Sequence, residues 1–220
     1  MRVLIVFALP LFYMARIAGA APLPEVCADM CALVEGAQFQ VLVRRSRSLT
    51  EKILLAIPDA HRSSIYAETL KLNSPENAKL DTMASNINFP AAPVFKIASE
   101  KVSLESSLKH VHEGLQLHQA LLSLVSSRLE AQRVTDLMNT VRDLAIQISK
   151  MLRALQTDYV AQTTPSPVTL YLHGDFEVQV AAHLTLVQLQ SLGQDTHRFL
   201  RGLDTSHEPE TDSDLLTQLK

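Results

Sequence analysis

The sequence contains no tryptophan, two cysteines and few aromatic residues, which account for 5% of its 220 positions. Its core must therefore be built from aliphatic side chains, chiefly leucine and valine. No His–Glu–x–x–His motif, Gly-rich phosphate loop or nucleophile-elbow pattern is present, and the single cysteine pair lacks the second ligand pair of a structural zinc site. We therefore expect no metal, no cofactor and no catalytic activity.

The two cysteines, Cys27 and Cys31, are four positions apart. On a regular helix this spacing holds the Cβ atoms about 5–6 Å apart, whereas a disulfide requires a distance nearer to about 4 Å. The pair is a disulfide candidate that can close only where the start of a helix is frayed. We expect this local bridge, with intermolecular pairing as the alternative.

Only one long apolar run is present, Val3–Tyr13, and it lies at the N-terminus. Arg2 precedes the run and the small residues Ala18, Gly19 and Ala20 follow it, which predicts a cleaved signal peptide over residues 1–20. The alternative is a membrane anchor, but the run is shorter than the roughly 20 residues that span a bilayer. We therefore expect a secreted, extracellular protein that does not insert into membranes after signal removal.

The mature chain is mildly acidic. Removing the signal takes Arg2 and Arg16 with it, which leaves 18 Lys and Arg against 23 Asp and Glu and a net charge of −5 with neutral histidines. Such a chain has no electrostatic basis for binding nucleic acid. The polar, acidic segment Asp204–Asp214 predicts a flexible tail over residues 204–220, after a single domain over residues 21–203.

Prolines are absent from three long stretches of the mature chain, Glu25–Ile57, Val94–Thr164 and Val168–Glu208. Proline breaks helix interiors, so these stretches can hold uninterrupted helices, and Pro58 should end the first one. The middle stretch is long enough for two helices. The sequence therefore predicts an all-α fold with four helices.

Apolar residues recur every three or four positions in each predicted helix, as a buried helical face requires. In the second helix they are Leu104, Leu108, Val111, Leu115, His118, Leu122, Val125 and Leu129. In the third they are Val134, Leu137, Val141, Leu144, Ile148, Met151 and Leu155. The first helix has a less regular row of Phe39, Leu42, Ser46, Leu49, Ile53 and Ala56. The last should begin near Asp175 as its N-cap and run to Leu203, and we expect His118 and His183 to be buried and hydrogen-bonded.

The connections between the helices differ greatly in length. Only a few residues near Glu130–Arg133 separate the second and third helices, so these two should be antiparallel neighbours. About 40 residues separate the first and second helices and roughly 15 separate the third and fourth, which favours an up-up-down-down bundle with two long crossover loops. In the first crossover we expect a short extra helix within Asp59–Leu72 and a loop over Asn73–Pro93.

The run from Leu108 to Leu122 resembles the signature of the interleukin-6, granulocyte colony-stimulating factor and myelomonocytic growth factor family, which ends G-L-x2-[FY]-x3-L. The matching residues are Gly114, Leu115 and Leu122. His118 stands at the aromatic position of the signature, and its two upstream cysteines fall on Ile97 and Ser107. Two further segments are similar to the granulocyte colony-stimulating factor branch: Val141–Leu144 in the third helix, and Val180–Leu184 with His197–Leu203 in the fourth.

The resemblance implies a long-chain four-helix cytokine, monomeric when free, that binds and crosslinks type I cytokine receptors. An interleukin-6-like cytokine is the alternative within the family. One receptor module would contact exposed faces of the first and third helices, and a second would contact the end of the bundle near the start of the fourth. The candidate receptor-binding residues are Glu35, Gln38, Arg45, Asp136, Asp143, Tyr171 and Phe176.

These candidates rest on different grounds. The resemblance places Asp143 at a receptor-contacting acidic position, and Asp136 lies one heptad before it on the same polar face. Arg45 belongs to the cluster of Arg44, Arg45 and Arg47, which either faces solvent or meets an acidic receptor patch.

An exchangeable lipid-binding bundle of the apolipoprotein type is the rival from a different class, because it would also be secreted, helical and aliphatic. Such proteins tend to have repeated amphipathic units with Lys and Arg beside the apolar face. This sequence has no internal repeat, and its connections are long and unequal. Receptor binding is therefore favoured.

Overall fold

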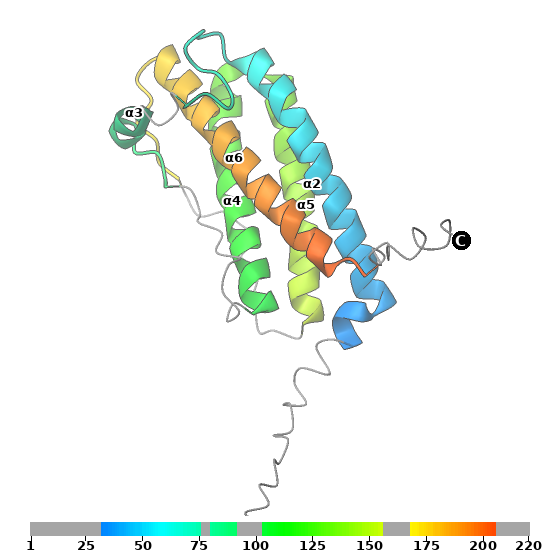
Figure 1. The fold of residues 1–220 in the computed structure, drawn as a ribbon. Coiled ribbons are helices and arrows are strands. Elements are labelled where there is room, and N and C mark those ends of the chain that lie inside the picture. The colour runs from blue at the N-terminus through cyan, green and yellow to red at the C-terminus, as the bar shows by residue number, and fades with distance from the viewer. Residues whose placement is uncertain (1–31, 76–79, 92–102, 156–167, 206–220) are drawn as a thin grey trace, which may run out of the picture.

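The computed structural model describes residues 32–75, 80–91, 103–155 and 168–205, and the regular secondary structure within these ranges is helical. The predicted all-α fold is confirmed. A short helix, α3 (Asp81–Asn86), packs against α6 at one end of the molecule (Figure 1). The long helices are α2 (Ala37–Ser64), α4 (Leu104–Leu129), α5 (Gln132–Ala154) and α6 (Asp175–Leu203).

Each long helix packs against two others around a shared core. Helix α5 lies between α2 and α4, and α6 lies against the same two helices from the other side. Contacts along α2 show that α6 runs antiparallel to it, since Gln40 lies beside Leu203 and His61 beside His183. In Figure 1 the colour of α2 runs from blue to cyan in one direction and that of α6 from yellow to orange in the other, so the two chain directions are opposite.

The core is aliphatic, as the scarcity of aromatic residues predicts. Within the described ranges Phe39 is the one buried aromatic side chain of the core. The largest fully buried side chains are Ile53, Ile57, Ile87, Leu108, Leu115, Leu121, Leu122, Leu137, Leu144, Ile148, Met151 and Leu152. The apolar rows predicted for the second and third helices therefore face the core.

Helix α2 continues through Pro58, so the prediction that this residue ends the first helix is wrong. An interior proline costs about 3 kcal/mol, but Pro58 faces solvent and the next turns bury Ala60 and Ser64 beside Ile57. Burying one isoleucine contributes about 1.5–3 kcal/mol, so packing of this face offsets the cost. The extra helix expected within Asp59–Leu72 is instead the end of α2.

Two other parts of the first helix and crossover differ from expectation. Gly36 interrupts the helical residues 32–35 and is the N-cap of α2, which therefore begins later than the stretch from Glu25 suggests. The expected loop Asn73–Pro93 contains α3. The buried row of α2 is also rotated, because Val43 and Thr50 are buried where Leu42 and Leu49 were expected.

The connection from α4 to α5 is a tight turn. Glu130 adopts a left-handed conformation with φ of 48°, and its N–H donates to Ser126 O. Helix α5 then begins at Gln132. The prediction that these helices are antiparallel neighbours is confirmed, because α4 and α5 are extensively in contact and only this turn joins them.

Helix α6 begins at Asp175, close to the predicted position, although Gly174 rather than Asp175 is the N-cap. The Glu177 carboxylate accepts hydrogen bonds from the N–H groups of His173 and Gly174. These backbone bonds hold the pKa of Glu177 below its usual value. Its carboxylate therefore satisfies the N–H groups of the N-cap residue and of the residue before it.

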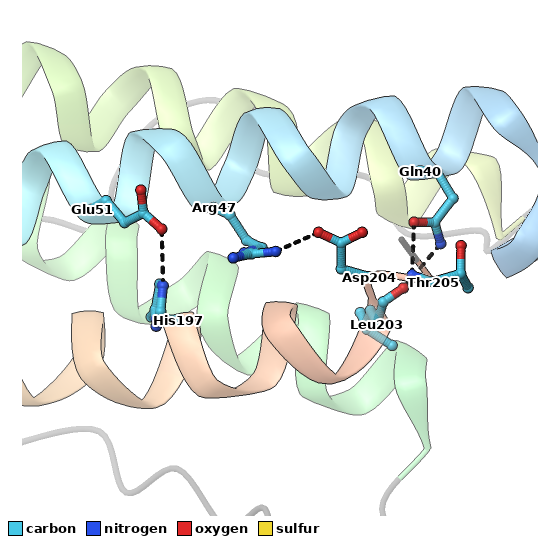
Figure 2. Close-up of polar contacts among 7 residues, drawn as sticks. All are labelled: Gln40, Arg47, Glu51, His197, Leu203, Asp204 and Thr205. Carbon is cyan, nitrogen blue, oxygen red and sulfur yellow. Dashed lines mark hydrogen bonds and ion pairs between the residues drawn. The ribbon is translucent and has the colours of Figure 1, made fainter. Parts of the chain in front are cut away.

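Polar contacts attach the end of α6 to the first half of α2 (Figure 2). Gln40 donates through Nε2 to Leu203 O at 2.9 Å and accepts at Oε1 from Thr205 N at 3.2 Å. Arg47 forms an ion pair with Asp204, whose side chain is 2% exposed. The predicted flexible tail is therefore wrong for Asp204 itself, and residues 206–220 lie outside the described residues.

Helices α2 and α6 approach closely at Gly193. A Cβ atom there would lie 2.9 Å from Cδ2 of Leu54, which is closer than packed carbon atoms come. A glycine in a helix costs about 1 kcal/mol relative to alanine, and at this position it allows Leu54 to pack directly on the α6 backbone.

Burial lowers the pKa values of four histidines in the described helices. Nε2 of His61 and Nδ1 of His183 lie 3.0 Å apart, and the two rings meet edge to face. Burial and then the neighbouring His61 lower the pKa of His183 to about 4. Burial also lowers the pKa values of His61, His112 and His118. His118 and His183 are both buried and hydrogen-bonded, as predicted.

The first prediction concerns the ion pair that ends α6. Asp204→Ala should lower the free energy of unfolding by about 1–3 kcal/mol, because Arg47 loses a charge-assisted partner at a largely buried site. Urea denaturation followed by circular dichroism measures this change. Asp195→Ala is the matched control: it removes an exposed i,i+3 pair with Arg198 and should cost under about 0.5 kcal/mol. Equal losses in the two variants would contradict the assignment.

The buried, neutral histidines make the stability of the fold depend on pH. An unfolded chain protonates histidine near pH 6.5, whereas folded His183 resists protonation until about pH 4. Stability from these neutral histidines is therefore present above about pH 6.5 and lost as pH falls toward 4.

We expect urea denaturation at stepped pH values to show this loss, and His183→Gln to reduce its slope between pH 6.5 and 4.5. His173→Gln, at an exposed ring, should keep the slope of the natural chain. A slope unaffected by His183→Gln would contradict the prediction, whatever the variant does to stability at neutral pH.

Candidate functional site

All seven predicted receptor-binding residues are exposed: Glu35, Gln38, Arg45, Asp136, Asp143, Tyr171 and Phe176. They do not form one cluster. The structure brings Asp136 and Asp143 together on one surface, places Tyr171 and Phe176 at the start of α6, and leaves Glu35 and Gln38 near the start of α2. The disulfide candidates Cys27 and Cys31 lie outside the described residues.

Asp136 and Asp143 line a shallow depression of about 460 Å³ between α2 and α5. Its α2 wall is formed by Lys52, Ala56 and Asp59. Its α5 wall is formed by Arg133, Asp136, Leu137, Asn139, Thr140 and Asp143. We call these nine residues the α2–α5 depression. The two aspartates share a face because seven residues complete almost two turns of an α-helix.

The charges of the α2–α5 depression are only partly compensated. Asp59 faces Arg133 at 3.5 Å and Arg62 at 3.3 Å. Asp136 accepts a hydrogen bond from Gln132 at 2.8 Å. Lys52 and Asp143 have no ion pair or hydrogen bond from their side chains to a described residue. One cation and one anion on this surface are therefore available to a partner.

In the family that the sequence resembles, a second acidic residue is expected three positions before the one matched by Asp143, and Thr140 stands there. Its side chain is mostly buried, and Oγ1 donates to Asp136 O at 3.0 Å within the helix. Thr140 therefore completes the wall of the depression without adding charge, and Asp143 is the α5 carboxylate here whose side chain has no hydrogen bond or ion pair with a described residue.

Sequence reasoning missed Lys52, Asp59 and Arg133 as parts of this surface. Asp59 was placed beyond the end of the first helix because Pro58 was expected to stop it. The sequence does show that these α2 residues share a face, because Lys52, Ala56 and Asp59 follow helical spacing. Only the pairing of α2 with α5 brings that face to Asp136 and Asp143.

The arginine cluster of α2 divides into two parts. Arg47 is used within the protein, through its ion pair with Asp204. Arg44 and Arg45 are exposed, and their side chains have no ion pair with a described residue.

Gln38 lies 14 residues before Lys52, which is about 21 Å along the helix axis. The structure therefore does not bring Glu35 or Gln38 to the depression.

The second group lies where the two crossovers meet beside α6. Tyr171 is 54% exposed and Phe176 is 48% exposed. The backbone N–H of Tyr171 donates to Ile87 O at 3.0 Å, and Asn88 donates to Thr169 O at 3.0 Å. These bonds fix the backbone that carries Tyr171, so its ring projects from a supported position.

A depression of about 380 Å³ lies near this group but is not lined by Tyr171 or Phe176. Its walls are Tyr66, Arg128, Leu129, His173, Gly174, Asp175, Val178 and Gln179. Tyr66 is 76% exposed and was missed by sequence reasoning. Oε1 of Gln179 accepts from the N–H groups of Tyr66 and Ala67, at 2.8 and 2.9 Å, and so holds this segment against α6.

Neither a metal-binding cluster nor a membrane-spanning helix is found among the residues that the structure describes. No group of three His, Cys, Asp or Glu side chains among the described residues is arranged to hold a metal ion. None of the described helices has the length and apolarity needed to cross a membrane. No protein-family model matches the chain, and no curated protein matches it. The functional assignment must therefore rest on the helix arrangement and the two exposed groups of residues.

Proposed function

We propose that the protein is a secreted long-chain helical cytokine that binds and crosslinks type I cytokine receptors, most like the granulocyte colony-stimulating factor branch. The observation that carries this proposal is the exposed Asp143, which has no partner among the described residues on the surface between α2 and α5. This is the acidic position to which the sequence resemblance assigns receptor contact.

The helix contacts support an up-up-down-down arrangement as part of the proposal. Helix α5 is antiparallel to α4 through their short turn, and antiparallel to α2 because Ser46 lies beside Met151 while Asp59 lies beside Arg133. Helix α6 is antiparallel to α2. Helix α2 then runs parallel to α4, and α5 runs parallel to α6. Each of these parallel pairs is consecutive in the chain, so each needs a long crossover connection.

The α2–α5 depression suits a protein partner better than a small molecule. It is open and shallow and has charges of both signs on its walls. Asp143 would pair with a cationic side chain of the receptor, and Lys52 with an anionic one, which favours specific orientation and rapid encounter. Ile146 lies about one turn beyond Asp143 and is 46% exposed, so it would add apolar contact area.

The second exposed group would bind a second receptor. Around the bundle, the pair α2 and α5 lies opposite the pair α4 and α6. Tyr171 and Phe176 precede or begin α6, and aromatic side chains are common anchors of protein interfaces. Two receptors could therefore bind opposite sides without excluding each other, and receptor-associated kinases would be brought together.

A charge reversal tests the first receptor contact. Asp143→Arg should reduce receptor activation at least about tenfold, because truncating or reversing an interface charge typically costs about 2 kcal/mol or more. The measurement is dose-dependent signalling in cells that express a candidate type I cytokine receptor, with circular dichroism to establish unchanged helicity. Glu113→Arg, at an exposed acid of α4, is the matched control and should signal normally. Normal signalling by Asp143→Arg would overturn the site assignment.

Truncation of the two aromatic side chains tests the second contact. The double variant Tyr171→Ala, Phe176→Ala should retain binding to the first receptor's ectodomain while losing most receptor activation. Surface plasmon resonance and cell signalling measure the two properties separately. Val41→Ala, at a similarly exposed apolar residue of α2, should change neither. Equal loss of ectodomain binding and activation would show that both groups contact the same receptor.

A further inference from the structure

Five basic side chains gather at one end of the bundle, on three adjacent helices. All of them are exposed. We call them the basic face: Arg44 and Arg45 on α2, Lys150 and Arg153 on α5, and Arg201 on α6. Their concentration is unexpected in a chain whose net charge is −3 before signal removal.

Interhelical contacts bring these side chains to one end. Gln40 donates to Leu203 O and Arg47 pairs with Asp204, so the last turn of α6, which carries Arg201, lies beside the first half of α2. On the other side of α2, the Oγ atom of Ser46 lies 3.8 Å from the Sδ atom of Met151. This second contact places the end of α5, with its two basic residues, beside the α2 arginines.

Two acidic residues beside the basic face have partners within the protein, whereas Glu35, nine residues before Arg44, and Asp143 on α5 have none in the described ranges. Asp204 pairs with Arg47, and Glu51 lies 3.1 Å from His197 (Figure 2). On α5, Asp143 lies seven residues before the first basic member, which is about 10 Å along the helix axis. That distance is close to one Debye length at physiological salt, so screening weakens its effect.

The basic face itself is not neutralised by the protein. None of its five side chains has an ion pair or hydrogen bond with a residue in the described ranges. The positive charge is therefore uncompensated locally and creates an attractive potential for anions.

The shape of the surface favours a linear polymer over a small anion. Lys150 and Arg153 are about 4.5 Å apart along the helix axis, and neighbouring helices are separated by about 8–10 Å. The basic side chains thus cross three helices over roughly 20 Å. Neither depression described above includes a residue of the basic face, so neither would enclose a single ion there.

We propose that the basic face binds a sulfated polysaccharide. Guanidinium groups match tetrahedral oxyanions with paired N–H donors, and a chain of repeating sulfates supplies one every few ångströms. The exposed aromatic residues Tyr66, Tyr171 and Phe176 lie on other segments, so the face lacks the stacking side chains that single-stranded nucleic acid uses. Since sulfated polysaccharides are extracellular, the biological role rests on the proposed secretion but not on receptor activation.

The test uses a triple variant of the mature chain, residues 21–220, which keeps the acidic residues after Asp204 present as competitors. The variant replaces Arg44, Lys150 and Arg201 with Ala and so removes one basic side chain from each helix of the face. Binding to heparin, chemically desulfated heparin and vesicles containing phosphatidylserine is measured at about 0.15 M salt, a roughly physiological ionic strength.

A second triple variant is the matched control for loss of charge. It replaces Arg62, Lys71 and Arg128 with Ala, so it also loses three exposed positive charges. These residues lie at the other end of the bundle, at or beyond the ends of α2 and α4.

We expect the natural chain to bind heparin but not its desulfated form. The Arg44→Ala, Lys150→Ala, Arg201→Ala variant should bind at least roughly tenfold more weakly, since each of the three exposed ion pairs contributes a factor of about two to five. Its affinity should also depend less steeply on salt, while the control binds like the natural chain. Equal weakening of both variants, absence of heparin binding, or stronger binding to the vesicles than to heparin would overturn the proposal.

Receptor signalling separates this inference from the proposed function. The Arg44→Ala, Lys150→Ala, Arg201→Ala variant avoids every residue of the α2–α5 depression, as well as Arg45 and the two aromatic residues at the start of α6. We expect it to activate the receptor normally. A variant that keeps heparin affinity but loses signalling would assign these basic residues to the receptor instead and overturn the polysaccharide site.

Discussion

The burial of Ile57, Ala60 and Ser64 holds the last two turns of α2 against the bundle. Because of this packing the helix continues past Pro58, and Asp59 reaches Arg133 at the start of α5. The surface between α2 and α5 is then continuous from Lys52 to Asp59. The Asp59–Arg133 end of this surface therefore depends on packing within the core, whereas Lys52 lies before Pro58 in the same helix.

Charge is distributed unequally over this scaffold. Acidic side chains such as Asp136 and Asp143 lie in the first half of α5, whereas Lys150 and Arg153 lie at its end. Cations at the C-terminal ends of α5 and α6 interact favourably with the helix dipoles, which is a structural reason for their position. The dipole does not account for the arginines of α2, because these lie in its first half. The proposed basic face therefore includes positive charge that helix stabilisation does not explain.

The regular parts of the fold could be predicted because one physical signal dominated them. In α4, α5 and α6 the buried residues recur at helical spacing, and no proline competes with this pattern. At Pro58 the helix propensity of proline favours an end to the helix, whereas tertiary packing favours its continuation. The structure shows that the helix continues. Likewise, the sequence shows that Asp204 is acidic and follows the last helix, but its pairing with Arg47 depends on a contact between residues 157 positions apart.

The candidate site was predictable only where it followed a single helix. Asp136 and Asp143 share a face by spacing alone, whereas Lys52 joins them through the pairing of α2 with α5.

His118 shows a different kind of limit. It occupies the aromatic position of the family signature, and its buried ring donates through Nδ1 to Gly114 O at 2.7 Å. A histidine there supplies a planar ring of suitable size to the core, but Nε2 is left without a hydrogen-bond partner among the described residues. Protonation of that nitrogen would place an uncompensated charge in the core, so filling an aromatic position with histidine ties the packing of this bundle to pH.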